Sequence, residues 1–296
     1  MKRRPLLIFL ALVAAVGAIG VTGVGIGWAV VCGGTKCPSL EQLEKYQPRQ
    51  TSRLYAADGR FIAEIGLERR TLVKLEQIPK HVQQAFVITE DKRFYDHGGI
   101  DFFRIFGAVL ANVRNRGISQ GFSTITMQLA RNLFPENLKA REKTITRKLR
   151  EAKVARAIEA KYSKDRILEL YLNQIYLGNG AYGVESAAHR YFGKSVRDLN
   201  VAEAATLASL PKAPERYNPR RFPDRAVQRR NTVVELMRRA GAVGDADASL
   251  ASAFPLRLSR KRGGTSEVAP YFVDWVRRAL DERFGKDLYE KPLKVF

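Results

Sequence analysis

Two adjacent carboxylates, Glu90 and Asp91, close the apolar run 85–88 and precede a histidine, His97. A carboxyl group at the end of an apolar helix is partly removed from water, and burial raises the pKa of a carboxyl group. A carboxylate with a raised pKa is a better general base near neutral pH, and sugar chemistry requires such a base. A helix end with two solvated acids fits the same residues. The pattern alone therefore leaves both interpretations open.

A second carboxylate, Glu151, lies in a strongly basic part of the chain. Arg147 and Lys148 precede it by four and three residues, so on a helix all three side chains share one face. These cations would keep the carboxylate charged and leave positive charge for an anionic group. The segment 131–170 holds twelve basic and six acidic residues, which also favours an anionic partner. A surface cluster of ion pairs is the alternative interpretation.

The elements that must position these residues are mostly helical. From Pro79 onward, apolar residues recur with helical spacing almost to the end of the chain. Before them, the segments 53–56 and 60–65 flank Asp58-Gly59 and predict a β-hairpin. The predicted fold is therefore mainly α with a small N-terminal β-hairpin. The last residues, 293–296, read as a strand that either joins the hairpin or begins a further domain.

The N-terminus predicts a membrane anchor. An uncharged apolar stretch, 6–31, follows the basic cluster 2–4 and is long enough to cross a hydrocarbon core of about 30 Å. The basic cluster places the N-terminus in the cytoplasm and everything after residue 31 outside it. A cleaved signal peptide is the alternative, although its apolar region is usually only about 7–15 residues long. We expect one uncleaved transmembrane helix.

Composition restricts the partners. The 296 residues include 51 Lys and Arg against 30 Asp and Glu, a formal net charge of +21, which favours an anionic partner. Nucleic acid is disfavoured, because the anchor would place the basic domain outside the cytoplasm and no nucleic-acid motif occurs. Cys32 and Cys37 are too few for a disulfide scaffold or a Cys-only zinc site. They either form a local disulfide or remain free thiols.

The region around Glu90 matches a family signature, Glu-Asp-x-x-Phe-x-x-His-x-Gly. The five matching positions are Glu90, Asp91, Phe94, His97 and Gly99. Four further elements of the same family follow in order, at 121–129, 147–151, 167–173 and 191–194. Over about residues 51 to 237, the chain therefore resembles glycosyltransferase family 51, the peptidoglycan glycosyltransferase domain of class A penicillin-binding proteins and of monofunctional transglycosylases.

The resemblance implies a lysozyme-like helical domain that polymerises lipid-linked disaccharide pentapeptide into glycan strands, with inversion and release of undecaprenyl diphosphate. It implies that Glu90 is the general base and Glu151 the second catalytic carboxylate. Substrate-binding positions are implied for Ser123, Thr124, Gln128, Arg131, Arg147 and Lys148. Supporting positions are implied for Asp91, Phe94, His97 and Asn173. Ser123, Thr124 and Gln128 also fit residues that merely cap or satisfy a helix end.

Several positions depart from the family pattern. Phe122 replaces a glycine, Met127 replaces a glutamine, and Gly107 stands where many relatives have an arginine. Arg131 replaces a lysine and keeps the charge. We expect Arg104, one turn before Gly107, to supply the lost charge. Because the paired glutamates are unchanged, these departures predict altered cleft contacts and not an inactive enzyme.

The resemblance also implies partners, location and organisation. The partners are the lipid-linked peptidoglycan precursor, the growing glycan strand and the membrane, with cell-wall synthesis proteins as further candidates and no nucleic acid. We expect no cofactor or metal bound by the protein, although a divalent cation, Mg²⁺ or Mn²⁺, could bind the substrate diphosphate. The expected location is the bacterial inner membrane, single-pass, with the catalytic domain on the outer, periplasmic side. The expected parts are the cytoplasmic tip and anchor, the neck, the glycosyltransferase domain, and a basic loop, helix and start of a further domain, at 1–31, 32–50, 51–240 and 241–296.

Two other functions fit the same features. A lysozyme-like lytic enzyme that cleaves the same polymer would also use two carboxylates on a helical domain. A non-catalytic basic module could instead hold to a membrane surface through its net charge. The products discriminate among the three, because a polymerase makes polymer, a lytic enzyme makes fragments, and a binding module makes neither.

Overall fold

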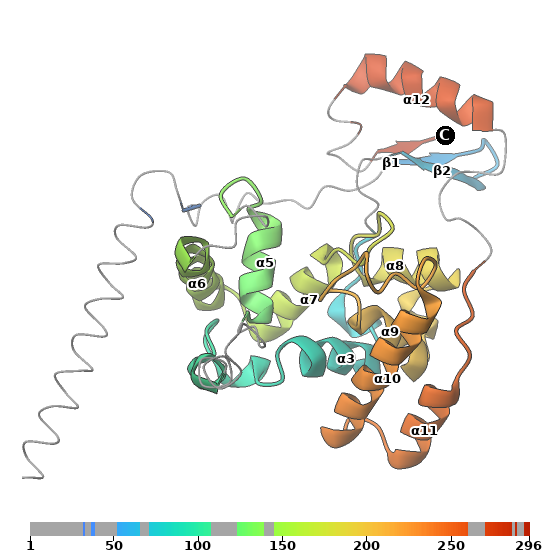
Figure 1. Ribbon diagram of the computed structural model, residues 1–296. Helices are drawn as coiled ribbons and strands as arrows, with labels where there is room; N and C mark the ends of the chain where they lie inside the picture. The colour runs from blue at the N-terminus through green and yellow to red at the C-terminus, as the bar shows by residue number, and fades with distance from the viewer. Residues whose placement is uncertain are drawn as a thin grey trace, which may run out of the picture.

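The computed structural model describes residues 32, 37–38, 52–65, 71–107, 123–138, 145–259, 270–285, 288 and 293–296. Within this part of the chain the fold is mainly helical, as predicted (Figure 1). The predicted anchor, 6–31, lies outside the described residues, and none of the described helices is long and apolar enough to span a membrane. Cys32 and Cys37 form a disulfide, which is one of the two alternatives that the sequence left open.

The helices differ in length but follow one another through short connections over much of the chain. In chain order they are α3 (Lys80–Glu90), α5 (Ile125–Leu133), α6 (Ile145–Lys161), α7 (Lys164–Gln174), α8 (Val184–Phe192), α9 (Val201–Ala208), α10 (Pro223–Arg239), α11 (Asp245–Ala253) and α12 (Pro270–Phe284). Short 3-10 helices are η2 (Leu75–Gln77), η3 (Phe94–Asp96) and η4 (Val196–Asp198).

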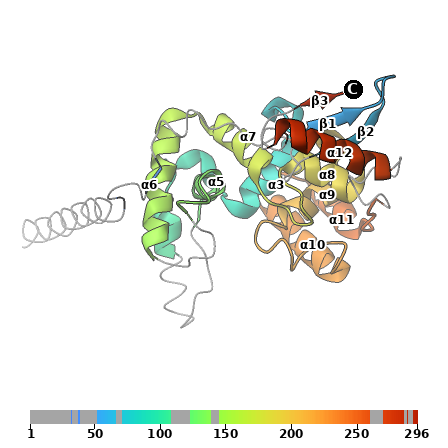
Figure 2. The same cartoon turned by 90° about the horizontal axis from the view of Figure 1, so that it is seen from above.

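The small sheet joins the two ends of the described chain. Strand β1 (Ser52–Tyr55) pairs antiparallel with β2 (Phe61–Ile65), which confirms the predicted hairpin. It also pairs parallel with β3 (Lys294–Val295), so the C-terminal strand joins the hairpin sheet. The hydroxyl of Ser52 donates a hydrogen bond of 2.8 Å to the carbonyl of Leu288. Helix α12 lies alongside this sheet in both ribbon views (Figure 2).

The helical part has two sides, with α3 and α7 between them. Helices α5 and α6 lie on one side and α8 to α11 on the other, in both views (Figures 1 and 2). The apolar face of α3 is buried at Val82 and Phe86, four residues apart, as the helical period requires. The ring of Phe86 meets that of Tyr171 of α7 edge to face, with centroids 6.4 Å apart. The two middle helices thus share one core, and α3 ends at the side occupied by α5.

Polar residues of α7 hold the segment that leads into α3. The side-chain amide of Asn173 accepts from the backbone N–H of Val73 at 2.9 Å and donates to its carbonyl at 2.8 Å. One turn earlier, Glu169 accepts from the backbone N–H of Leu75 at 2.8 Å. Glu169 and Asn173 both belong to the fourth family element. The contacts of Asn173 fix the segment that leads into α3. The supporting role that the resemblance implies for it stays a prediction.

Candidate active site

Glu90 is the last residue of α3, and its carboxylate meets α5. The amide Nε2 of Gln128 donates a hydrogen bond of 2.8 Å to Oε2 of Glu90. Burial raises the pKa of Glu90, and the hydrogen bond from Gln128 and the charges of Arg104 and Arg229 oppose that shift. Such a carboxyl binds a proton more readily than an exposed glutamate, as a general base should.

Arg104 fixes the backbone at Glu90. Its guanidinium donates a hydrogen bond to the carbonyl oxygen of Glu90 and lies 3.8 Å from Oδ1 of Asp91. The last carbonyls of a helix lack intrahelical partners, and the helix dipole favours a cation there. We expected Arg104 to replace the charge lost at Gly107. In the structure the guanidinium of Arg104 contacts the backbone carbonyl of Glu90 and the carboxylate of Asp91.

Asp91 connects Glu90 with the beginning of α5. It is buried, and its Oδ2 accepts a hydrogen bond of 3.0 Å from the backbone N–H of Ile125, the first residue of α5. A negative charge at this end of a helix is stabilised by the helix dipole. Both carboxylate oxygens also lie 3.1 Å from Nε2 of His97. Asp91 and His97 therefore hold the loop after Glu90 against α5. The supporting roles that the resemblance implies for them stay predictions.

Phe94 and Gly99 complete the first signature for steric reasons. Phe94 is fully buried, and the ammonium of Lys164 lies 4.4 Å from its ring centroid, a cation–π contact. Gly99 has a φ of +87°, and a Cβ built on it would lie only 3.0 Å from the carbonyl carbon of Ala155. Its carbonyl accepts a hydrogen bond of 2.7 Å from the hydroxyl of Thr124. The signature thus needs an aromatic core residue and a residue without Cβ.

Replacing Gly99 with alanine is expected to destabilise the domain by about 1–3 kcal/mol, because a positive φ is strained and the new Cβ meets backbone. Gly98→Ala is the matched control, since a Cβ at Gly98 meets nothing within 4 Å. Thermal unfolding of both variants measures the difference, at roughly 2–4 °C per kcal/mol. Equal melting temperatures for the two variants would contradict the steric account.

Glu151 of α6 is fully buried among three cations. Its Oε1 accepts hydrogen bonds from Arg147 and, at 3.4 Å, from Arg131. Its Oε2 accepts from the ammonium of Lys148 at 2.8 Å. Lys148 also donates to the hydroxyl of Ser123 at 2.5 Å. Burial lowers the pKa of Lys148, and the carboxylate of Glu151 opposes that shift. Three cations around one carboxylate leave an excess of positive charge.

Helix α5 links the two carboxylates. Gln128 binds Glu90 and Arg131 binds Glu151. Gln128 and Arg131 are three residues apart, which is about one turn and roughly 4.5 Å along the helix axis. One face of α5 therefore meets both glutamates, although they are distant in the sequence.

Thr124 has a different environment from the other predicted substrate contacts. It is fully buried, and its hydroxyl accepts from the backbone N–H of Met127 at 3.2 Å as the N-cap of α5. The same hydroxyl donates to Gly99. These contacts fit the capping alternative. The substrate contact of Thr124 stays a prediction, as do those of Ser123, Gln128, Arg131, Arg147 and Lys148.

Two residues that influence the environment of Glu90, Tyr171 and Arg229, were not predicted from the sequence. The hydroxyl of Tyr171 donates to Oε1 of Gln128 at 3.4 Å, and the charge of Arg229 of α10 acts on Glu90. Tyr171 belongs to the element 167–173 and could have been noted there. Arg229 carried no local signal, because only the packing of α10 brings it near.

One cluster of possible metal ligands lies beside this site. Ligand atoms of Asp91, His97 and Asp101 lie within 4.8 Å of one another, among the residues that the structure describes. Asp101 accepts from the backbone N–H of Arg104 at 3.0 Å and lies 3.7 Å from the guanidinium of Arg93. Arginines already balance these carboxylates, so a metal ion would have to displace them.

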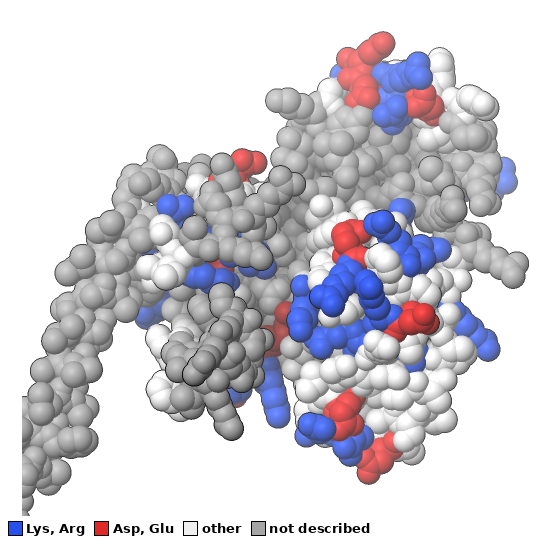
Figure 3. Space-filling model, viewed as in Figure 1, with Lys and Arg blue, Asp and Glu red and all other residues white. Residues whose placement is uncertain are grey.

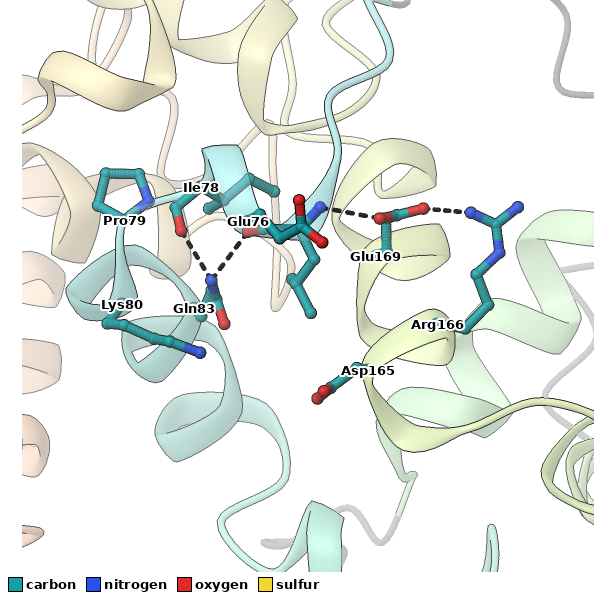
Figure 4. A pocket seen from close by; sticks show the side chains of 9 residues that line it. Glu76, Ile78, Pro79, Lys80, Gln83, Asp165, Arg166 and Glu169 are labelled. Carbon is teal, nitrogen blue, oxygen red and sulfur yellow. Dashed lines mark hydrogen bonds and ion pairs between the residues drawn. The ribbon is translucent and has the colours of Figure 1, made fainter.

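A pocket of about 440 Å³ lies between η2, α3 and α7 (Figure 4). Gln83 is one of its lining residues, and its amide donates to the carbonyls of Leu75 and Ile78 at 3.0 and 2.7 Å. Neither Glu90 nor Glu151 lines this pocket. Four of its polar residues already make hydrogen bonds or ion pairs within the protein, namely Gln83, Asp165, Arg166 and Glu169. We therefore place the candidate chemistry at the two glutamates and not in this pocket.

The positive charge is not confined to the site. Lys and Arg side chains are spread over both sides of the molecule in the face shown in Figure 3, with acidic side chains between them. A diffuse charge of this kind suits attraction to an anionic surface. The cluster around Glu151 differs from it, because there the cations converge on one buried group.

Comparison with known proteins gives concordant matches. A family model described as "Transglycosylase" matches residues 58–238. The chain is 45% identical over 259 residues to penicillin-binding protein 1A of Aquifex aeolicus (strain VF5), covering 88% of this chain and 35% of that protein. It is 42% identical over 275 residues to penicillin-binding protein 1A of Neisseria flavescens, covering 93% and 34%. A crystal structure of penicillin-binding protein 1A from Haemophilus influenzae matches with a TM-score of 0.50 and 28% identity, covering 82% of this chain and 26% of that one. The chain spans about a third of the length of the curated relatives it matches.

Proposed function

Since the chain belongs to the transglycosylase family, whose model matches more than half of it, we propose that it is a peptidoglycan glycosyltransferase. It polymerises a lipid-linked disaccharide pentapeptide into glycan strands. The observation that carries the proposal is the pair of glutamates bound by one face of α5. Glu90 has a raised pKa, and Glu151 is buried among cations.

The two glutamates have different tasks in this reaction. Glu90 accepts the proton of the acceptor sugar's 4-hydroxyl as that oxygen attacks C1 of the growing chain. The new oxygen–C1 bond forms on the face opposite the breaking C1–O bond to phosphate, so the configuration at C1 inverts. The electron pair of the broken bond leaves with undecaprenyl diphosphate. Arg131, Arg147 and Lys148 stabilise that charge, and Glu151 holds the three cations in place.

We further propose that the domain has a lysozyme-like helical fold. Residues 6–31 would anchor it in the bacterial inner membrane, with the catalytic domain on the outer side of that membrane. Such an anchor would keep the domain beside its lipid-linked substrate. A divalent cation on the substrate diphosphate and contacts with other cell-wall synthesis proteins belong to the same proposal, as do the part boundaries at residues 31, 50 and 240.

A lytic enzyme acting on the same polymer is the second candidate. It would also use two carboxylates. However, cleavage of a finished glycan releases no diphosphate, so it gives no role to the cations around Glu151. The cations around Glu151 therefore favour transfer from a diphosphate donor.

Product analysis tests the proposal. The full chain, purified in detergent, is incubated in separate reactions with lipid-linked disaccharide pentapeptide and with finished peptidoglycan. We expect a ladder of glycan strands from the precursor and no soluble fragments from the finished wall. Fragments without a ladder would support the lytic enzyme, and the absence of both would support a binding module. Either result would overturn the proposal.

A further inference from the structure

A chain of two hydrogen bonds crosses three helices and ends at Glu90. The hydroxyl of Tyr171 in α7 donates to Oε1 of Gln128 in α5 at 3.4 Å. The amide nitrogen of Gln128 donates to the carboxylate of Glu90 in α3 at 2.8 Å. The first bond is longer than the usual O–H···O hydrogen bond and is therefore the weaker of the two, and the second is of ordinary length. Gln128 is therefore held on both of its amide atoms.

The orientation of the Gln128 amide decides what Glu90 meets. A side-chain amide has a donor and an acceptor end of nearly equal size, and either end can be turned toward a neighbour. With the nitrogen toward Glu90, the carboxylate gains a donor that stabilises its charged form. With the oxygen toward Glu90, two acceptors would face each other. The group that binds the other end of the amide therefore influences the charge state of Glu90.

Tyr171 is suited to hold this orientation. Its side chain is fully buried, and its ring packs edge to face against Phe86 with centroids 6.4 Å apart. Burial raises the pKa of Tyr171 well above its ordinary value, so its hydroxyl stays protonated. Gln128 Oε1 accepts its hydrogen bond, and turning the amide would remove this acceptor from a buried donor, which is unfavourable.

We propose that Tyr171 is a positioning residue for the general base and acts through Gln128, whose amide it keeps turned with the nitrogen toward Glu90. The role of Glu90 as the base rests on the proposed function. The hydrogen-bond chain and its effect on the Glu90 carboxyl do not, so the two can be tested separately.

Substituting Tyr171→Phe tests the inference, because it removes only the hydroxyl and keeps the buried ring. Gln128→Met removes the donor itself and is expected to raise the pKa of Glu90 by about one unit, since a hydrogen bond to a charged group is worth about that much. Tyr171→Phe is expected to raise it by roughly half as much, because the amide remains but is no longer oriented. The pKa is measured from the pH dependence of the ¹³C carboxyl signal of Glu90, assigned by its loss in Glu90→Gln.

Two comparisons separate this role from a structural one. In a Gln128→Met background, Tyr171→Phe should cause no further shift, because the residue through which it acts is gone. Tyr191→Phe is the matched control, since Tyr191 is also fully buried but its hydroxyl donates to the carbonyl of Leu177 at 2.9 Å. That control should leave the pKa of Glu90 at the wild-type value.

The outcomes are distinguishable from those of the proposed function. An unchanged Glu90 pKa in Tyr171→Phe, or an equal shift with and without Gln128, would overturn the role of Tyr171. If the shifts appear as expected but the wild-type protein makes no polymer, the proposed function fails while the positioning role stands. In an active protein, the acid limb of the pH profile of kcat/KM should move to higher pH by the same amount. That limb should not move in Tyr191→Phe.

Discussion

Replacing Glu90 with glutamine is expected to lower kcat for glycan polymerisation by about 10²–10⁴-fold, the usual contribution of a general base. Glutamine has nearly the same shape and can still accept from Gln128, but it cannot take up the proton of the attacking hydroxyl. The rate is measured as consumption of labelled lipid-linked precursor at saturating concentration. Glu136→Gln is the control, because Glu136 is exposed in the turn after α5 and should keep the wild-type rate.

The Glu90→Gln variant should lose activity without losing stability. Because burial raises the pKa of Glu90, the folded protein binds a proton at this group more readily than the unfolded chain does. The resulting cost to stability is present above the folded pKa and is relieved as the pH falls through it. Glutamine removes this cost, so at pH 7 the variant should melt at or above the wild-type temperature. A wild-type rate, or a loss of rate explained by unfolding, would contradict the role of Glu90.

Replacing Glu151 with glutamine is expected to reduce stability as well as activity. Glu151 is fully buried and compensates the charges of Arg147, Lys148 and Arg131. Removing one partner from a buried ion pair costs about 3–5 kcal/mol, because its partner, here the buried Arg147, is left without a compensating charge. The melting temperature should fall by roughly 10 °C. kcat/KM, measured below the melting transition, should also fall, because the cations lose the geometry that receives the diphosphate.

Glu235→Gln is the control for this second prediction. Glu235 also accepts from two arginines, Arg238 and Arg239, but it lies on the exposed surface of α10. Solvent screens exposed ion pairs, so the change should leave the melting temperature and the rate close to those of the wild type. Equal effects of the two substitutions would show that burial of the Glu151 cluster contributes nothing.

Features that depend on local spacing were predictable from the sequence. Arg147 and Lys148 lie four and three residues before Glu151 on one helix, so their contacts with Glu151 follow from the helical period. The hairpin was predictable for the same reason, because Asp58-Gly59 and the strands beside it are contiguous.

Features that depend on packing between distant segments were not predictable from the sequence. The contact between Gln128 and Glu90 spans 38 residues and that between Tyr171 and Gln128 spans 43. Nothing in the sequence near either end indicates that α3, α5 and α7 converge. The partner of the C-terminal strand could not be predicted either, because β3 pairs with β1, which lies near the other end of the sequence. For Thr124 the resemblance implies a substrate position, and the structure shows that its hydroxyl caps α5. The substrate contact stays a prediction.

The most direct test of the central claim compares glycan products of the wild type and Glu90→Gln on one gel. Both proteins, at equal concentration and with melting temperatures checked, are incubated with labelled lipid-linked disaccharide pentapeptide at pH 7. We predict a ladder of strands from the wild type that lysozyme digests, and no ladder from Glu90→Gln. The absence of a ladder from the folded wild type, or a ladder of equal intensity from the variant, would contradict the account.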